Sequence, residues 1–244
     1  MLTKSHIKLI TSLNQKKCRQ QEQLFVVEGV KGIKEFLNSS FKLHLLFSTE
    51  TIFDAETITV SDKELQKISS LKSPNTAVAV FNIPKLTAVR QAIETLVPSG
   101  LIVALDDVRD PGNLGTIIRL CDWFGIQNLI CSNATVDCYN SKVVQATMGS
   151  LTRINIQYVD LELYLKGYNN DIFGTFMDGS NIYKERLPEK GIIVMGNEAN
   201  GISQAIERLV TKKISIPRFG DLKATESLNV ATATSIVLSE FKRD

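Results

Sequence analysis

Residues 101–124 read LIVALDDVRDPGNLGTIIRLCDWF: an apolar run, a polar turn with two glycines, and a second apolar run. The first five residues are typical of a buried strand, and the apolar spacing over 116–124 is typical of a helix. A glycine-bearing turn between a strand and a helix presents backbone N–H groups to an anion, which is a weak signal by itself. The turn contains neither G-x-G-x-x-G nor a Walker sequence, so no dinucleotide or P-loop fingerprint explains its glycines.

The alternation of strand and helix continues beyond this stretch. Further strands are predicted at 128–132, 171–177, 191–195 and 213–216, and further helices near 141–149, 203–210 and 227–241. Such alternation predicts an α/β fold with a mostly parallel sheet covered by helices on both faces. Ligands of open parallel sheets bind at the carboxyl ends of the strands, so the loops after the strands should carry the functional residues.

A smaller α/β unit is predicted in the first third of the chain. Its strands are expected at 24–29, 43–47, 58–60 and 77–81, and its helices at 30–37 and at 62–68, the latter opened by Ser61. The breakers Pro98 and Gly100 follow a polar connection. We therefore expect a domain of residues 1–81, a linker at 82–99 and a second domain of residues 100–244.

Positive charge is concentrated near the N-terminus. Residues 1–42 hold eight basic and three acidic side chains, a net charge of +5, whereas the whole chain carries +2. Clustered positive charge is what a nucleic-acid surface requires, although such a cluster is more often only a solvated face. Lys16, Lys17 and Arg19 are the candidate RNA contacts in this segment.

Composition excludes several classes of protein. No run of about 18 apolar residues occurs, so neither a membrane span nor a signal peptide is expected. The four cysteines form no C-x-x-C pair, which fits a reducing compartment and small buried side chains rather than zinc ligands. Both histidines, His6 and His44, precede the second domain, so that domain has no imidazole for a Ser/His/Asp triad. We expect a soluble, cytoplasmic, metal-free protein.

Three loops of the second domain hold unusual polar residues. Arg119 lies in an apolar helical run, where a guanidinium needs a task or a partner, and an ion pair with Asp106 or Asp122 is the structural alternative. Gly196, at the end of a strand and before Glu198, would let the backbone approach a ligand. Asn229 is expected in the first turn of the last helix, and its alternative interpretation is an exposed polar residue.

Together these loops resemble the SpoU or TrmH-like branch of the SPOUT superfamily of RNA methyltransferases. The tract 110–115, DPGNLG, with Arg119 is similar to the first motif, and the tract 195–198, MGNE, with Gly201 and Ser203 to the second. Ile216-Pro217 with the tract 227–230, SLNV, is similar to the third. Three tracts in order over half of the chain are specific, whereas residues 27–29, VEG, resemble the family's ribosomal-protein-like α/β substrate domain more weakly.

The resemblance implies that a methyl group is transferred from S-adenosylmethionine to a ribose 2'-hydroxyl, with ribosomal RNA favoured over transfer RNA. It also implies a deep trefoil knot that binds the donor, and a homodimer whose second subunit completes the site. The implied catalytic set is Asn113, Arg119, Glu198 and Asn229. The implied donor-binding set is Thr175, Met195, Gly196, Ile216, Ser227 and Leu228.

One departure from the family lies in residues 218–225, which are a few residues longer than usual at the wall of the donor pocket. Arg218, Phe219 and Lys223 within it are residue types that stack on bases and contact phosphates, so Arg218 and Lys223 are further candidate RNA contacts.

The chemistry is compatible with these residues. S-adenosylmethionine is already activated, so alignment and charge stabilisation suffice. Arg119 would grip a phosphate and stabilise the forming alkoxide, because a guanidinium does not act as a free base. Two rival interpretations are a non-catalytic RNA-binding or ribosome-assembly factor and a nucleotide-dependent oxidoreductase. The intact polar set argues against the first, and the missing glycine fingerprint against the second.

Overall fold

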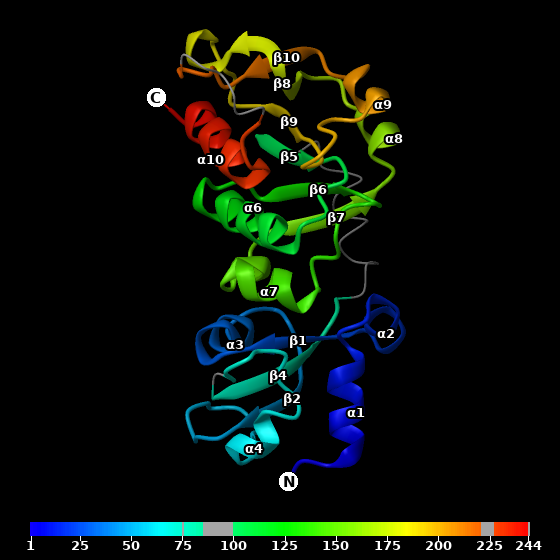
Figure 1. Ribbon diagram of the computed structural model, residues 1–244, viewed down its shortest axis with the longest axis vertical. Helices are drawn as coiled ribbons and strands as arrows, with labels where there is room; N and C mark the ends of the chain where they lie inside the picture. Colours follow the sequence, from blue (N-terminus) through cyan, green and yellow to red (C-terminus); the bar gives the residue numbers. More distant parts are fainter. Residues whose placement is uncertain (75, 85–99, 221–226, 244) are drawn as a thin grey trace. The chain divides into compact units, whose positions relative to one another are not determined.

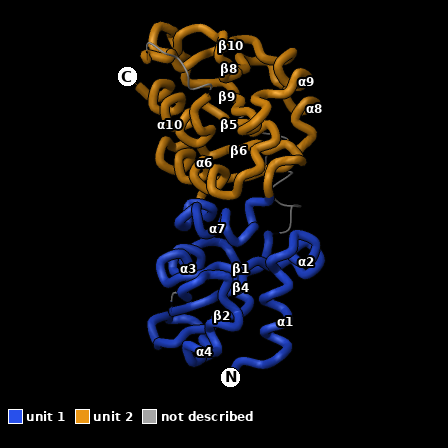
Figure 2. Tube along the Cα trace, in the orientation of Figure 1, with its two compact units in different colours: residues 1–91, 137–152 blue, residues 92–136, 153–244 orange. Residues whose placement is uncertain are grey.

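A computed structural model of the chain describes residues 1–74, 76–84, 100–220 and 227–243 (Figure 1). Most of the expected linker, residues 85–99, and the candidate RNA contact Lys223 lie outside the described residues. The chain divides into two compact units (Figure 2). The first comprises Met1–Gln91 and Asp137–Thr152, and the second comprises Ala92–Val136 and Arg153–Asp244.

The first unit is a four-stranded mixed sheet with helices on both faces. The sheet order is β1-β4-β2-β3, in which β4 is antiparallel to β1 and β2, and β3 is parallel to β2. The elements are α1 (Lys4–Ser12), α2 (Lys16–Glu22), β1 (Leu24–Glu28), α3 (Val30–Leu37), β2 (Leu43–Ser48), β3 (Ile58–Thr59), α4 (Asp62–Leu65), β4 (Ala77–Asn82) and α7 (Ser141–Thr147), with a short 3-10 helix at Ser150–Thr152. All four strands and both helices predicted for residues 1–81 are confirmed, whereas α1 and α2 were not predicted.

Alternation along β1 separates two apolar layers of this unit. Leu24 and Val26 join a cluster with Ile10 and Leu13 of the α1 region. Phe25 points the other way and packs edge-on against Phe36 of α3 at 5.5 Å between ring centroids. The predicted helix start at Ser61 is confirmed, because the Ser61 hydroxyl accepts from the N–H of Glu64 and the Glu64 carboxylate accepts from the N–H of Ser61.

Arg19 is a structural residue of the first unit. Its side chain is buried, and its Nε and Nη2 donate to Oδ2 of Asp137 at 3.0 and 2.6 Å. Its Nη1 donates to the carbonyl oxygens of Leu13 and Asn14. The interpretation of Arg19 as an RNA contact was therefore wrong, because the guanidinium is already paired and shielded from solvent. A sequence cannot reveal this pairing, since the partner lies 118 positions away.

The second unit contains a six-stranded sheet in the order β10-β8-β9-β5-β6-β7, and every pair of neighbours is parallel. Its elements are β5 (Leu101–Leu105), α6 (Pro111–Trp123), β6 (Asn128–Ser132), β7 (Asn155–Val159), α8 (Leu161–Lys166), β8 (Ile172–Asn181), a 3-10 helix η2 (Ile182–Lys184), β9 (Gly191–Met195), α9 (Gln204–Glu207), β10 (Lys212–Ser215) and α10 (Val230–Phe241). The mostly parallel, helix-covered sheet is confirmed. The sequence interpretation missed β7 and α8, whose apolar runs are short.

Helices cover both faces of this sheet (Figure 1). Leu161 of α8 and Ile206 of α9 pack with Ile102, Ile172 and Ile192 on one face. The opposite face carries α6 and α10, which contact each other, and Phe173 of β8 packs edge-on against Phe241 of α10 at 5.0 Å. The neighbours Ile172 and Phe173 thus face opposite layers, as alternation along a strand requires.

Helix α6 begins at Pro111, five residues earlier than the sequence interpretation placed it. The Asp110 carboxylate accepts from the N–H of Asn113 at 2.8 Å, which caps the helix, and Pro111 at the first helical position has no N–H to leave unpaired. Gly112 therefore lies inside the helix rather than in a turn. Across the described residues, no helix combines the length and apolarity needed to span a bilayer.

Candidate functional site

Three loops follow strands of the parallel sheet in the second unit. β5 is the neighbour of β9, and β8 separates β9 from β10. Because parallel strands all end at one edge, the segments after Leu105, Met195 and Ser215 leave the sheet on the same side. These are the three loops in which the sequence placed the candidate catalytic and donor-binding residues.

A chain of hydrogen bonds joins the three loops. The amide nitrogen of Asn113 donates to Oε1 of Glu198 at 3.0 Å, and the amide nitrogen of Asn229 donates to Oδ1 of Asn113 at 2.9 Å. The structure thus brings together three of the four predicted catalytic residues. Asn113 is the central member, because one end of its amide donates and the other accepts.

Glu198 is also held by the main chain. Its carboxylate accepts from the backbone N–H groups of Arg109, at 3.3 Å, and Asp110, at 3.2 Å. The N–H groups of this strand-to-helix loop therefore do face an anion, but the anion is the chain's own carboxylate. Burial alone would raise the pKa of Glu198, but the hydrogen bonds from Asn113 and from three backbone N–H groups outweigh it, and the pKa is lowered. Glu198 is accordingly a carboxylate that orients its neighbours.

Asn229 caps helix α10. Its Oδ1 accepts from the N–H groups of Ala231, at 3.0 Å, and Thr232, at 3.2 Å, while its amide nitrogen donates to Asn113. The residue lies just before the helix rather than in its first turn, and its side chain is engaged at both ends. Asn229 is an exposed polar residue, as the alternative interpretation expects, and its side chain is also hydrogen-bonded to Asn113.

Two polar residues of the site were not predicted. Asp107 adopts a left-handed backbone conformation, with φ of 61°, which is uncommon for a residue other than glycine. Its N–H donates to Ser132, and its carbonyl accepts from the Asn197 amide at 2.7 Å. Such conformations persist only where surrounding bonds impose them, and they gather at functional sites. The adjacency of Asn197 to Glu198 was the available signal for Asn197.

Arg119 stands apart from this chain of hydrogen bonds. It is exposed on α6 and makes no hydrogen bond or ion pair with another described residue. It lies six residues beyond Asn113, which at 3.6 residues per turn is about 240° around the helix. Trp123, one turn after Arg119 on the same face, has 83% of its surface exposed.

The ion pairs offered as alternatives for Arg119 do not form. Asp122 pairs with Arg153, with Nη2 and Oδ2 2.8 Å apart. Asp106 accepts from the backbone N–H of Ser203 at 2.7 Å. Both carboxylates therefore have other partners, and the structure leaves the guanidinium of Arg119 facing solvent.

The predicted donor-binding residues lie along the same sheet edge. Thr175 is half-buried in β8 and donates its hydroxyl to the carbonyl of Val194 at 3.3 Å. Met195 is buried at the end of β9, Ile216 is half-buried, and Ser227 and Leu228 are exposed. Leu228 has 48% of its surface exposed, so it offers apolar area that a flat heteroaromatic ring could cover. Ile216 and Leu228 both lie in the segment between β10 and α10, and their accessible apolar side chains suit the adenosine group of the donor.

The path of its own loop already requires a glycine at Gly196. A Cβ at this position would lie 2.2 Å from the carbonyl carbon of Gly201 and 2.3 Å from the nitrogen of Ile202. The glycine therefore permits the loop to fold back on its own main chain, and Asn197 and Gly201 exchange two backbone hydrogen bonds there. Close approach to a ligand is not needed to explain it.

Two aromatic rings lie exposed in the segments that follow β8 and β10. Phe219 has 82% of its surface exposed and stacks on Tyr183, with ring centroids 6.4 Å apart and planes 30° apart. Arg218 is also exposed. Tyr183 was not predicted, since nothing in its own sequence context distinguishes it.

No disulfide joins the cysteines of the described residues. Cys121, Cys131 and Cys138 are buried and Cys18 is half-buried, and burial raises the pKa of the Cys121 thiol to about 12. Within residues 1–74, 76–84, 100–220 and 227–243, no three His, Cys, Asp or Glu side chains are grouped to hold a metal ion.

Known proteins match both parts of the chain. Residues 100–239 match the SpoU rRNA Methylase family, and residues 4–79 match the MRM3-like substrate binding domain. The chain is 28% identical over 242 residues to the 23S rRNA (guanosine(2553)-2'-O)-methyltransferase RlmP of Bacillus subtilis, covering 94% of this chain and 93% of that protein.

Two solved structures have folds similar to that of this chain over nearly its whole length. A protein of the TrmH family from Porphyromonas gingivalis is 35% identical, with a TM-score of 0.85, and the match covers 99% of this chain and 98% of the other. An AdoMet-bound rRNA methyltransferase from Sinorhizobium meliloti is 29% identical, with a TM-score of 0.85 and coverage of 99% and 95%.

Proposed function

Because this chain belongs to the SpoU rRNA Methylase family, we propose that it transfers a methyl group from S-adenosylmethionine to a ribose 2'-hydroxyl of RNA. Ribosomal RNA is the favoured substrate, since a relative matched over nearly its full length is named for 23S rRNA. The observation that carries the proposal is the hydrogen-bonded chain of Glu198, Asn113 and Asn229, which ties all three family motifs to one sheet edge.

The donor, when bound, supplies an electrophilic methyl group on a sulfonium. The residues of this chain then have to orient the ribose and stabilise the charge that develops on its oxygen. Asn113 and Asn229 each use one amide hydrogen within the chain of hydrogen bonds, which leaves a second hydrogen on each nitrogen to donate to the ribose. Glu198, kept ionised, holds Asn113 in the orientation that makes this possible.

Arg119 serves as a phosphate clamp and charge stabiliser. Its guanidinium is exposed and has no partner among the described residues, so its donors are available to a nucleotide phosphate. The proton of the 2'-hydroxyl passes to that phosphate or to solvent, because the guanidinium is already fully protonated.

We further propose a homodimer in which Arg119 of one subunit acts beside Asn113 and Asn229 of the other. Arg119 faces away from Asn113 on the same helix, so the two do not converge within one chain. Trp123 supports this arrangement, because an almost fully exposed tryptophan beside Arg119 is typical of an interface residue.

The two family matches suggest a separate function for each part of the chain. Residues 1–81 would bind the RNA substrate, residues 82–99 would link, and residues 100–244 would form the methyltransferase domain with its trefoil knot. Lys16 and Lys17 are exposed and, with Arg218 and Lys223, are the proposed phosphate contacts. An enzyme acting on ribosomal RNA in this way would work in the cytoplasm.

Labelled methyl transfer tests the reaction directly. The protein is incubated with S-adenosylmethionine carrying a labelled methyl group and, in separate reactions, with unmodified ribosomal RNA and unmodified transfer RNA, and the RNA is then hydrolysed in alkali. Alkaline cleavage needs a free 2'-hydroxyl, so 2'-O-methylation yields labelled dinucleotides, whereas base methylation yields labelled mononucleotides. Labelled dinucleotides are the expected result. Label in transfer RNA alone would reassign the substrate, and no label in any RNA would favour a non-catalytic assembly factor.

A further inference from the structure

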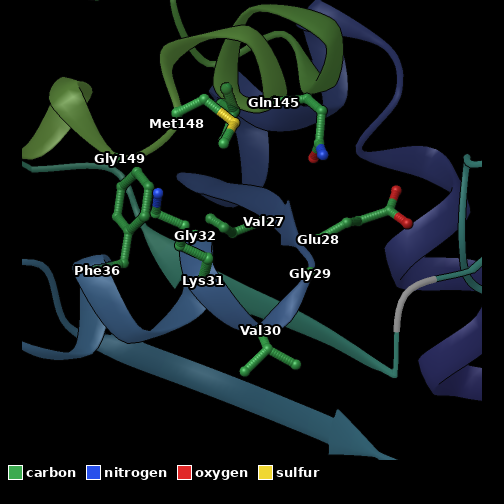
Figure 3. A pocket seen from close by; sticks show the side chains of 11 residues that line it. Val27, Glu28, Gly29, Val30, Lys31, Gly32, Phe36, Gln145, Met148 and Gly149 are labelled. Atoms are coloured by element: carbon green, nitrogen blue, oxygen red, sulfur yellow. The ribbon is translucent and has the colours of Figure 1, made fainter.

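A cavity in the first unit lies between the β1–α3 connection and helix α7 (Figure 3). It has a volume of about 320 Å³, at the lower end of the size of small-molecule sites. Val27 and Phe36 line it from the N-terminal segment, and Val144 and Met148 line it from α7. Figure 3 shows Gln145 and Met148 pointing from α7 toward the end of β1. The cavity is therefore built from two segments that are more than a hundred residues apart.

The walls of the cavity are firmly packed rather than loosely apposed. A Cβ at Gly149 would lie 2.6 Å from the Cγ of Glu35, so the end of α7 sits tightly against α3. Met148, which ends α7, has φ of 52° and 43% of its surface exposed. A left-handed residue commonly ends a helix, and here it leaves the apolar side chain of Met148 partly exposed beside the cavity.

Two polar side chains at the cavity lack partners within the described chain. The Gln145 amide and the Lys31 ammonium line the cavity, and neither makes a hydrogen bond or ion pair with another described residue. Gln145 is half-buried and Lys31 is exposed. The cavity thus combines apolar walls with one group that both donates and accepts, one positive charge, and the carboxylate of Glu28, which already accepts hydrogen bonds from Ser69 and Ser70.

We infer that this cavity holds one unpaired nucleotide of the RNA substrate, with α7 supplying half of the site. A base packs its faces against apolar side chains, an amide can pair with the base edge, and a lysine can contact the adjoining phosphate. Residues 4–79, which include β1 and α3, match a substrate binding domain, but that match does not reach α7. The inference rests on the proposed RNA substrate and adds to it a defined subsite.

Gly32 allows a test in which folding is protected. A Cβ at Gly32 would meet only the Val27 side chain, at 3.5 Å, which is ordinary contact. Gly32 lies within α3, where alanine or leucine favours the helix more than glycine does. Gly32→Ala and Gly32→Leu should therefore retain thermal stability while they fill the cavity progressively. Lys34→Ala, which removes an exposed lysine of the same helix that does not line the cavity, is the matched control for Lys31→Ala.

Affinity for deproteinised 23S rRNA is measured by filter binding, together with a single-stranded oligoribonucleotide and a fully paired duplex of equal length. Gly32→Leu should raise the Kd for the first two RNAs roughly tenfold or more, leave the duplex unaffected, and leave the affinity for S-adenosylmethionine unchanged. Gly32→Ala should fall between Gly32→Leu and the wild type. Lys31→Ala should weaken binding and reduce its salt dependence, whereas Lys34→Ala should do so less.

If Gly32→Leu keeps its thermal stability and its Kd for RNA is unchanged, the inference is wrong. A cavity that instead bound a protein or a metabolite would give this same result. Failure of the nucleotide subsite can be distinguished from failure of the proposed enzymatic function. If the wild type methylates RNA and Gly32→Leu keeps the same KM for RNA, the subsite is wrong and the enzymatic function stands. If RNA binding depends on Gly32 but no RNA is methylated, the subsite stands and the enzymatic function fails.

Discussion

At the scale of single residues, the site depends on the direction in which one amide faces. Asn113 donates to Glu198 and accepts from Asn229, so reversing its amide would place like atoms together at both ends. The neighbours therefore fix Asn113 in one orientation, with its remaining amide hydrogen available to a substrate. This single orientation makes the site sensitive to changes of one atom.

Asn229→Asp separates the two roles of Asn229. Aspartate caps helices about as well as asparagine, so the bonds from Ala231 and Thr232 persist and thermal stability should change little. Aspartate has no N–H group to donate a hydrogen bond to Asn113, so methyl transfer should fall at least tenfold. Asn229→Ala, by contrast, should also lower stability by about 1 kcal/mol. Calorimetric melting and labelled methyl transfer measure the two effects. Full activity in Asn229→Asp would show that the amide bond to Asn113 is dispensable.

Arg119→Ala should leave donor affinity nearly intact and reduce kcat by about 10²–10³-fold, because an electrostatic role is exerted mainly in the transition state. Calorimetry with S-adenosylmethionine and single-turnover methyl transfer provide the two readouts. Arg119 is exposed on α6, so the substitution should not disturb the fold. Turnover close to that of the wild type would remove Arg119 from the catalytic set.

Glu198 gives a prediction for acid pH. Its pKa in the folded protein lies below the ordinary value of 4.5, so the stability that its ionised form contributes is present above 4.5 and is lost as pH falls through the folded pKa. The difference in Tm between the wild type and Glu198→Gln should therefore be constant from pH 7 to about 5 and shrink below pH 4.5. A difference that instead grew in acid would mean that the pKa is raised.

At the scale of elements, the loop after β9 is shaped by its own main chain. Gly196→Ala should lower Tm and weaken donor binding, since the added Cβ overlaps the main chain at Gly201 and Ile202. Gly201→Ala is the control. Its φ of +68° makes alanine cost about 1 kcal/mol, but no atom lies within 4 Å of the new Cβ, so donor binding should persist. Equal behaviour of the two variants in melting and in calorimetry would refute this explanation.

Patterns within about ten residues were enough to predict most elements of the fold. The alternation of apolar runs predicted β5, β6 and β9 with the bounds that the structure shows, and Ser61 predicted the start of α4. The start of α6 was placed five residues late, because the glycines in the tract 110–115 suggested a turn and the cap from Asp110 was overlooked. Short elements with weak patterns, such as β7 and α8, were missed.

The candidate site was predictable only in part, for a physical reason. The resemblance of the three loops to the SpoU or TrmH-like family pointed to Asn113, Glu198 and Asn229, which the fold then brings into contact. The pairing of Arg19 with Asp137, the strained Asp107 and the ring of Tyr183 depend on contacts between distant segments, and no local pattern encodes them. Whether Arg119 works within its own chain is likewise a question about assembly rather than about local sequence.

At the scale of the whole molecule, the proposed homodimer predicts complementation. Arg119→Ala and Asn229→Asp, each nearly inactive, should recover about one quarter of wild-type activity when mixed and allowed to exchange. Half of the dimers would then be mixed, and each mixed dimer would hold one intact site composed of both subunits. Co-expression with two affinity tags isolates the mixed dimer. No recovery in a verified mixed dimer would place both residues in the same subunit's site.

Part of the region that matches the SpoU rRNA Methylase family belongs to the first unit. This limits how the N-terminal and catalytic parts of the chain can be exchanged. Residues 137–152 lie inside the 100–239 match, yet they pack with residues 1–91, through the Arg19–Asp137 ion pair and the contact between Phe25 and Tyr139. A chimera that joined the N-terminal segment to another catalytic domain would therefore leave a buried arginine without its carboxylate. Exchange of N-terminal segments among relatives would therefore require a compatible 137–152 segment within the catalytic half.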